Sequence, residues 1–163
     1  MTKIEFKQID NVDNISEVIK EVFEVELDIS GGWGYDNTTA LIVNNLKEMK
    51  IDQFIHTFAS IRANVEMNLT LDEDERYGGI NVEFMDGKQI ELDNIKYDMI
   101  TFKISAMKEK DYAVFIQEYK DNYGKNKDFD MTDHFKRRNE STISIEVDYW
   151  FIGLENFYHD DTK

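Results

Sequence analysis

Apolar residues recur at helical spacing in three parts of the chain. Residues 15–23 carry a narrow apolar stripe behind Asn14, a residue type that caps helices, and residues 51–65 carry a wider stripe. Residues 112–123 repeat aromatic and aliphatic side chains every three or four positions, and Gly124 follows as a terminator. The spacing therefore predicts three helices.

Elsewhere the apolar positions alternate with polar ones, which is typical of strands with one buried face. This pattern predicts a mostly antiparallel sheet of about six to eight strands, drawn from residues 2–9, 23–29, 38–43, 65–71, 80–84, 90–92, 100–104 and 143–151. Residues 38–43 also fit a short helix that begins at Asp36. Asp86-Gly87 tolerates the positive φ of a two-residue hairpin, so we expect a turn there. The strand at 100–104 follows either a loop at Asp93-Asn94 or a bend in the preceding strand.

No internal repeat, linker or low-complexity run divides the chain. Residues 125–140 are polar and are expected to be irregular, and residues 158–163 are expected to form a frayed tail. The prediction is a single α+β domain over residues 1–163.

The amino-acid composition excludes several kinds of site and of protein. The chain has no cysteine, which excludes disulfides and thiolate zinc sites, and 41% of its residues are hydrophobic, as in globular proteins. Its first residues do not resemble a signal peptide, and it contains no apolar run of membrane-spanning length. A cytoplasmic location without membrane contact is expected.

The formal net charge is −15, and it is unevenly distributed. Residues 99–141 are near neutral, with eight acids and nine bases, so the excess acidity lies in the rest of the chain. Such a charge repels nucleic acid and anionic membranes and favours a basic protein partner. Lys136-Arg137-Arg138 is the one basic cluster, and we interpret it as local neutralisation.

The stretch from Ser30 to Asp36 contains three of the eight glycines and one of the two tryptophans. It lacks the lysine of a phosphate-binding loop. It can be a tight turn between strands in which Trp33 caps the sheet end. It can also present Trp33 and Tyr35, with Asp36, to a partner, because such aromatic residues often anchor interfaces.

The densest acidic run is Asp72, Glu73, Asp74 and Glu75. It lacks the pattern of a calcium loop, so it is either a solvated loop or a docking patch for a basic partner. Neither the three histidines nor any serine has the spacing of a metal or catalytic motif. We expect no catalytic residues, no metal and no cofactor.

The strand at 143–151 also places Trp150 on its outer row. We expect this face to be covered by a helix of the same chain or by a second subunit, which leaves a homo-oligomer through the Trp150 face or the edge strands open.

In bulk composition the chain resembles the immunity proteins of bacterial competition systems, although no motif carries that resemblance. The leading hypothesis is a small acidic binding protein without catalytic activity that binds a basic partner through the residues above. The alternative is a small-molecule-binding or enzymatic domain with an aromatic pocket between sheet and helices.

Overall fold

The computed structural model describes residues 6–162, which form a five-stranded mixed sheet with four α-helices. The helices are α1 (Ile15–Phe23), α2 (Ile51–Asn64), α3 (Glu109–Asn122) and α4 (Met131–Ser141). The strands are β1 (Asp28–Gly31), β2 (Leu41–Asn45), β3 (Tyr77–Leu92), β4 (Ile95–Lys108) and β5 (Ile143–Ile152). A π-helical segment η1 (Val65–Leu69) extends α2, and a 3-10 helix η2 (Leu154–Thr162) follows β5. None of the helices in this range is both long and apolar enough to cross a membrane.

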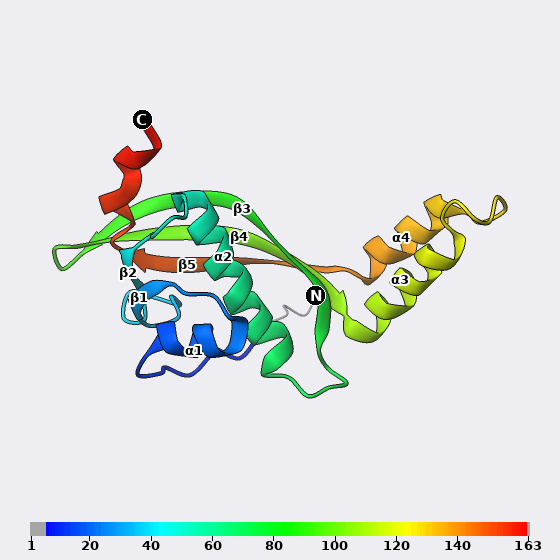
Figure 1. Ribbon diagram of the computed structural model, residues 1–163, viewed down its shortest axis with the longest axis horizontal. Helices are drawn as coiled ribbons and strands as arrows, with labels where there is room; N and C mark the ends of the chain where they lie inside the picture. Colours follow the sequence, from blue (N-terminus) through cyan, green and yellow to red (C-terminus); the bar gives the residue numbers. More distant parts are fainter. Residues whose placement is uncertain (1–5, 163) are drawn as a thin grey trace.

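The sheet has the strand order β1-β2-β5-β4-β3, and β2–β5 is its parallel pair. Figure 1 shows α1 and α2 lying against one face of the sheet. The buried side chains of α1, α2 and all five strands form one hydrophobic cluster, with Phe58 of α2 fully buried at its centre. Burial of this cluster is the main driving force of the fold.

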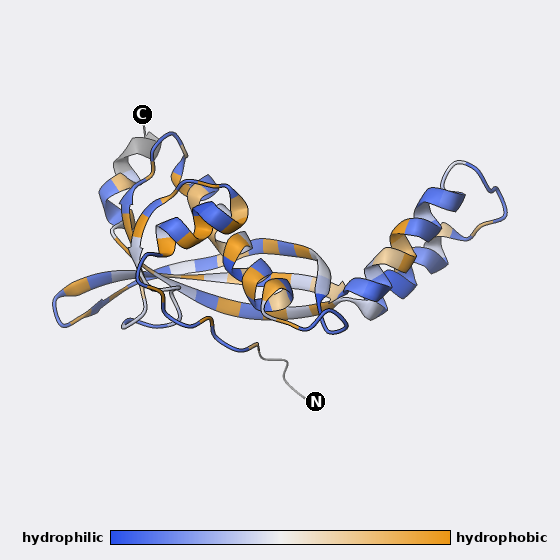
Figure 2. Ribbon diagram, turned by 60° about the horizontal axis from the view of Figure 1, so that its bottom comes forward, coloured by the Kyte–Doolittle hydropathy of each residue, from blue (hydrophilic) through white to orange (hydrophobic). Residues whose placement is uncertain are grey.

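Helices α3 and α4 project away from one end of the sheet as an antiparallel pair (Figure 1). We call residues 109–141 the arm. Figure 2 shows apolar and polar residues interspersed along both helices. Phe115 of α3 and His134 of α4 are buried against each other, whereas Val114 and Phe135 are exposed. The arm carries eight acids and seven bases, so almost all of the net negative charge belongs to the rest of the chain.

Several sequence-based predictions are confirmed. The helix at 15–23 has the predicted bounds, and the Asn14 side chain accepts a hydrogen bond from the Glu17 backbone N–H at 3.1 Å. Helices α2 and α3 and strand β5 also lie where the periodicity places them. The α+β class and the mostly antiparallel sheet follow from these elements.

The predicted hairpin at Asp86-Gly87 is wrong. β3 continues through these residues with an irregularity in register between Phe84 and Asp86, and the chain turns instead at Asp93-Asn94, where both φ angles are positive. Asp and Asn tolerate this conformation, so both sites could turn locally. The later turn gives β3 and β4 a much longer ladder, which places β4 between β3 and β5.

Two further segments differ in type. Residues 65–71 are not a strand, because the helix continues into η1, whose Val65 carbonyl accepts from the Thr70 hydroxyl at 2.9 Å. Residues 125–140 are not wholly irregular, because Asp130 caps α4 by accepting from the Asp133 N–H at 3.1 Å. The protein therefore has four helices rather than three within residues 6–162.

Within residues 6–162 the sheet has five strands rather than six to eight. In the segment 23–29, Phe23 ends α1 with Glu24 in the left-handed conformation behind it, and strand β1 begins only at Asp28. Residues 38–43 contribute to β2 only from Leu41. Residues 6–9 form no strand, and residues 2–5 of that prediction lie outside the described residues. Fraying of residues 158–163 stays a prediction.

Candidate functional site

The glycine stretch is a connection between β1 and β2 that is held against β5. The Gly34 N–H donates to the Thr39 carbonyl at 2.7 Å, and the Gly34 carbonyl accepts from the Trp150 N–H at 2.9 Å. Gly34 has a φ of +86°, and a Cβ there would lie 2.9 Å from the Trp150 carbonyl oxygen. Only glycine combines this backbone angle with so close an approach.

Trp33 lies in the core. Its side chain is 2% exposed and its ring stacks on Phe58 at a centroid distance of 6.1 Å. The expectation of a presented indole is therefore wrong, because burying so large an apolar ring stabilises the fold more than exposing it at a turn. The interpretation of this stretch as a turn with Trp33 packed at the sheet end is supported.

Asp36 is exposed but shapes its own turn. Its Oδ1 accepts from the backbone N–H groups of Thr38 and Thr39 at 2.9 and 3.0 Å and from both threonine hydroxyls. The Thr38 hydroxyl, first among these donors, lowers the pKa of Asp36. One carboxylate oxygen is thus used inside the turn, as in other Asx turns.

A buried cation that the sequence reasoning missed fixes this turn to α2. Arg62 is 2% exposed, and its guanidinium lies between the rings of Tyr35 and Tyr149, 3.9 and 4.0 Å from their centroids. Its Nη1 donates to the carbonyls of Trp33 and Gly34 at 3.3 and 3.1 Å. The sequence does indicate that Arg62 is buried, because Arg62 follows Phe58 by four positions and so falls on the apolar stripe of α2.

Glu66 supplies the counter-charge. Its Oε1 lies 3.5 Å from Arg62 Nε, and its Oε2 accepts from the Tyr35 hydroxyl at 2.7 Å. The same hydroxyl accepts from the Ile9 N–H at 2.9 Å, so Tyr35 also tethers the segment before α1. Burial raises the pKa of Glu66 and of Tyr35, while the nearby Arg62 opposes both shifts. Arg62 Nε has no hydrogen-bond partner among the described residues and contacts Glu66 only as an ion pair. The cluster is buried and holds the turn against α2, so it stabilises the fold rather than presenting a reactive group.

The acidic run lies in a different place, in the loop between η1 and β3. Asp72, Glu73, Asp74 and Glu75 are all exposed, and no ion pair involving their carboxylates is found within the described residues. The Lys108 ammonium donates to the Glu75 backbone carbonyl at 3.2 Å, which anchors the loop without neutralising its side chains. This loop is accessible as an acidic patch.

A second acidic area surrounds α1. We call it the α1 acidic surface, and it consists of the exposed residues Asp10, Asp13, Glu17, Glu21, Glu24 and Asp28. The nearby Lys20 and Lys47 both bind Glu26, at 3.0 and 3.6 Å, rather than these six carboxylates. An open groove between α1 and β1 is lined by Glu17, Glu21 and Asp28. In Figure 1, α1 and the loop after η1 both lie along the lower side of the molecule.

The arm contains its own polar cluster. His134 is fully buried, and its Nδ1 donates to the Glu118 carboxylate at 2.8 Å. Arg137 donates to both Glu118 oxygens and, through Nε, to Asp133 at 2.8 Å. The hydrogen bonds from Arg137, then from His134, lower the pKa of Glu118 to about 2. The Nε2 of His134 has no partner among the described residues, and four aromatic rings surround the imidazole, those of Phe115, Tyr119, Phe129 and Phe135.

Trp150 is half buried on the sheet face opposite α2, where the Tyr97 ring of β4 meets it edge-on at 5.7 Å. Towards the arm this face is polar, with Thr101 donating to Asp148 at 2.6 Å. Self-association through this face or the edge strands stays a prediction.

Within the part of the chain that the structure describes, no group of three or more histidine, aspartate or glutamate side chains is placed to hold a metal ion. Comparison of the chain with protein-family models, with curated proteins and with solved structures gave no match.

Proposed function

We propose that the protein is a small acidic binding protein that recruits a basic protein partner without catalysing a reaction on it. The observation that carries this proposal is the α1 acidic surface. Three of its six exposed carboxylates, those of Glu17, Glu21 and Asp28, line a groove, and none of the six is the carboxylate that Lys20 and Lys47 bind. A concentrated surface charge accelerates encounter with an oppositely charged partner and orients it. The loop at Asp72–Glu75 extends the same charge.

The surface proposed to bind the partner differs from the one expected from sequence. Trp33 packs inside, so the aromatic anchor pair is not available to a partner, and Asp36 is the exposed member of that stretch. The acidic groups around α1 take the central role instead. An inhibitor of a basic toxin, which the composition resembles, is one form that such a protein takes.

The test compares two charge-matched variants against a panel of basic proteins. One variant neutralises the groove with Glu17→Gln, Glu21→Gln and Asp28→Asn. The control makes the same change on the β3–β4 hairpin with Glu83→Gln, Glu91→Gln and Asp93→Asn, all of them exposed positions. Surface plasmon resonance at low and high salt reports the affinity and rate for each pair.

We expect the groove variant to bind its basic partner about tenfold more weakly, since three exposed charge contacts at about 0.5 kcal/mol each add to roughly that factor. The hairpin variant should bind as the unmodified protein does, and salt should weaken the unmodified complex. The proposal is wrong if no basic protein binds, if binding is independent of salt, or if both variants lose affinity equally.

One observation favours the alternative of a small-molecule-binding domain. A pocket lined by the rings of Tyr112 and Phe135 lies where α3 and α4 meet the ends of β3 and β4. Neither His56 nor an acid with a raised pKa lines it, so the pocket supports binding rather than acid–base catalysis.

A further inference from the structure

The pocket at the base of the arm has an apolar floor and aromatic walls. It encloses about 310 Å³, at the lower end of the range for small-molecule sites. Ala106 and Met107 at the end of β4 are 2% and 5% exposed and form the floor. Tyr112 of α3 and Phe135 of α4 line the sides, so the cavity bridges the arm and the sheet.

A pair of glycines makes room for the Tyr112 wall. A Cβ on Gly79, whose φ is +60°, would lie 2.7 Å from Tyr112 Cε2, and a Cβ on Gly78 would lie 3.3 Å from Cδ1. The β3–β4 register shifts between Gly78 and Asn81, so β3 bends at this point. The ring therefore lies directly against the backbone, and the chain uses glycine where any other residue would displace the ring.

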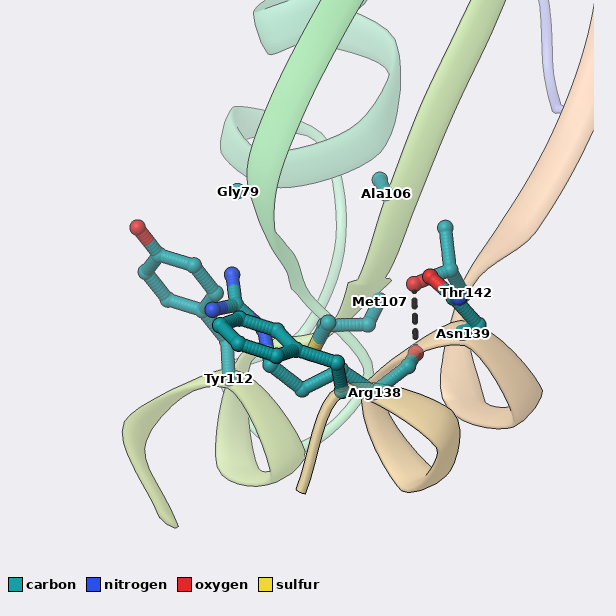
Figure 3. A pocket seen from close by; sticks show the side chains of 8 residues that line it. Gly79, Ala106, Met107, Tyr112, Arg138, Asn139 and Thr142 are labelled. Atoms are coloured by element: carbon teal, nitrogen blue, oxygen red, sulfur yellow. Dashed lines mark hydrogen bonds between the residues drawn. The ribbon is translucent and has the colours of Figure 1, made fainter. Parts of the chain in front are cut away.

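The polar side of the pocket is formed by Arg138, Asn139 and Thr142. The Thr142 hydroxyl donates to the Arg138 carbonyl at 2.7 Å and ties the end of α4 to the start of β5. Figure 3 shows the side chains of Arg138 and Tyr112 pointing toward the same space. The half-buried guanidinium thus faces the cavity.

Arg138 has no carboxylate within ion-pair distance in the described part of the chain. The neighbouring Arg137, in contrast, forms ion pairs with two carboxylates, those of Glu118 and Asp133. Arg138 thus keeps a half-buried guanidinium beside the cavity that no carboxylate of the described residues neutralises. Guanidinium groups recognise carboxylates through paired hydrogen bonds in one plane.

We propose that this pocket binds the carboxylate of an aromatic or apolar acid. The carboxylate would meet the Arg138 guanidinium, with the Asn139 amide at the same rim. The apolar body would pack on Met107 between the aromatic walls. Two sources present this chemistry, a free aromatic acid and the C-terminal residue of a polypeptide. The proposal does not depend on the α1 acidic surface, so each can fail without the other.

Calorimetric titration of the full chain tests the site with three probes. Phenylacetate represents the free acid and N-acetylphenylalanine represents a polypeptide C-terminus. N-acetylphenylalaninamide, which is neutral and nearly isosteric with the second probe, is the control ligand. Arg138→Gln removes the charge, and Lys136→Gln makes the same change two residues earlier on α4, at an exposed position outside the pocket lining.

We expect both acids to bind and the amide to bind far more weakly. Arg138→Gln should weaken acid binding roughly ten- to a hundredfold, as expected for loss of a charge-assisted hydrogen bond, whereas Lys136→Gln should leave it unchanged. Tighter binding of N-acetylphenylalanine than of phenylacetate would identify a polypeptide C-terminus as the source, and the reverse order a free acid. The proposal is overturned if neither acid binds at millimolar concentration, if the amide binds as well as the acid, or if the two variants have equal effects.

Discussion

Replacing Arg62 tests the account of the buried cluster most directly. We expect Arg62→Met to lower the free energy of unfolding by about 3–5 kcal/mol near neutral pH, the usual cost of removing one partner of a buried ion pair. Methionine retains much of the volume of the arginine stem, so the change removes charge and donors more than packing. The Glu66 carboxylate, 8% exposed, would then be buried without its cation.

The two partners of the pair should differ in their effect. Glu66→Gln leaves Arg62 with the Trp33 and Gly34 carbonyls and with two tyrosine faces, each face contributing about 0.5–2 kcal/mol. Arg62→Met leaves Glu66 with the Tyr35 hydroxyl alone. We therefore expect Glu66→Gln to cost only about 1–2 kcal/mol. Glu66→Gln made in the Arg62→Met background should restore stability, because it removes the lone charge.

The penalty should also depend on pH. Burial raises the pKa of Glu66 in the folded protein and Arg62 opposes that shift, so Arg62→Met raises this pKa further. A carboxyl group whose folded pKa exceeds its unfolded pKa loses stability as pH rises from the unfolded value through the folded one. Arg62→Met should thus be less destabilising at pH 5 than at pH 8.

Denaturant unfolding followed by tryptophan fluorescence measures these differences at both pH values. A cost of Arg62→Met below about 1 kcal/mol at pH 8 would refute a stabilising Arg62–Glu66 pair, since a buried unpaired carboxylate should cost more. Such a pair is equally refuted if Glu66→Gln costs more than Arg62→Met, or if the Arg62→Met penalty does not change between pH 5 and pH 8.

Three further outcomes are expected. Trp33→Ala should lower the free energy of unfolding by about 3–5 kcal/mol, because it leaves a cavity in the core. Thermal or denaturant unfolding measures this loss, and a loss below about 1 kcal/mol would contradict the packed indole. Gly79→Ala should destabilise the protein more than Gly124→Ala does, because both glycines have a positive φ but only a Cβ on Gly79 would meet the Tyr112 ring. Equal losses of stability would show that the Tyr112 ring moves aside without cost. The arm should lose hydrogen-exchange protection as pH falls from the unfolded pKa of Glu118 toward its folded value of about 2, because a lowered pKa gives stability that is lost on acidification. Glu118→Gln should remove this pH dependence, and persistence of the dependence in that variant would assign it to other groups.

The sequence predicts best where one local pattern decides an element. Ile15–Phe23 begins at a capping asparagine and keeps a helical period to its end, and Ile143–Ile152 alternates without interruption. The turn at Asp93-Asn94 could not be chosen over Asp86-Gly87 from local preference, since both pairs tolerate positive φ. The choice depends on the length of the β3–β4 ladder, which is a property of the whole sheet.

The arm and the buried cluster escaped prediction for a different reason. His134 behaves as a core residue of the α3–α4 pair, and Arg62 behaves as one of the main core, although both are polar types. Their burial is possible because each has an acidic partner. The Glu118 carboxylate of α3 accepts a hydrogen bond from His134, and Glu66, four residues after Arg62, supplies the counter-charge of that guanidinium. A polar residue on an apolar stripe is the sequence signal in both cases, but its partners become known only from the fold. Trp33 shows the converse, since its glycine-rich turn was compatible with a packed or a presented indole, and only the fold brings the Phe58 ring to it.

Three arginines of this chain show how the fold treats a guanidinium group beside aromatic rings. Arg62 has two tyrosine faces and the Glu66 carboxylate, and Arg137 has the Phe115 ring, 5.8 Å from its Cζ to the centroid, and two carboxylates. Arg138 has the Phe135 ring at 6.0 Å and faces the cavity beside Tyr112, but the described residues bring it no carboxylate. An external carboxylate would give Arg138 the same set of neighbours that the chain itself builds around the other two. Since the cavity joins the arm to the sheet, its occupant would contact both, and binding would then restrain the arm relative to the acidic body.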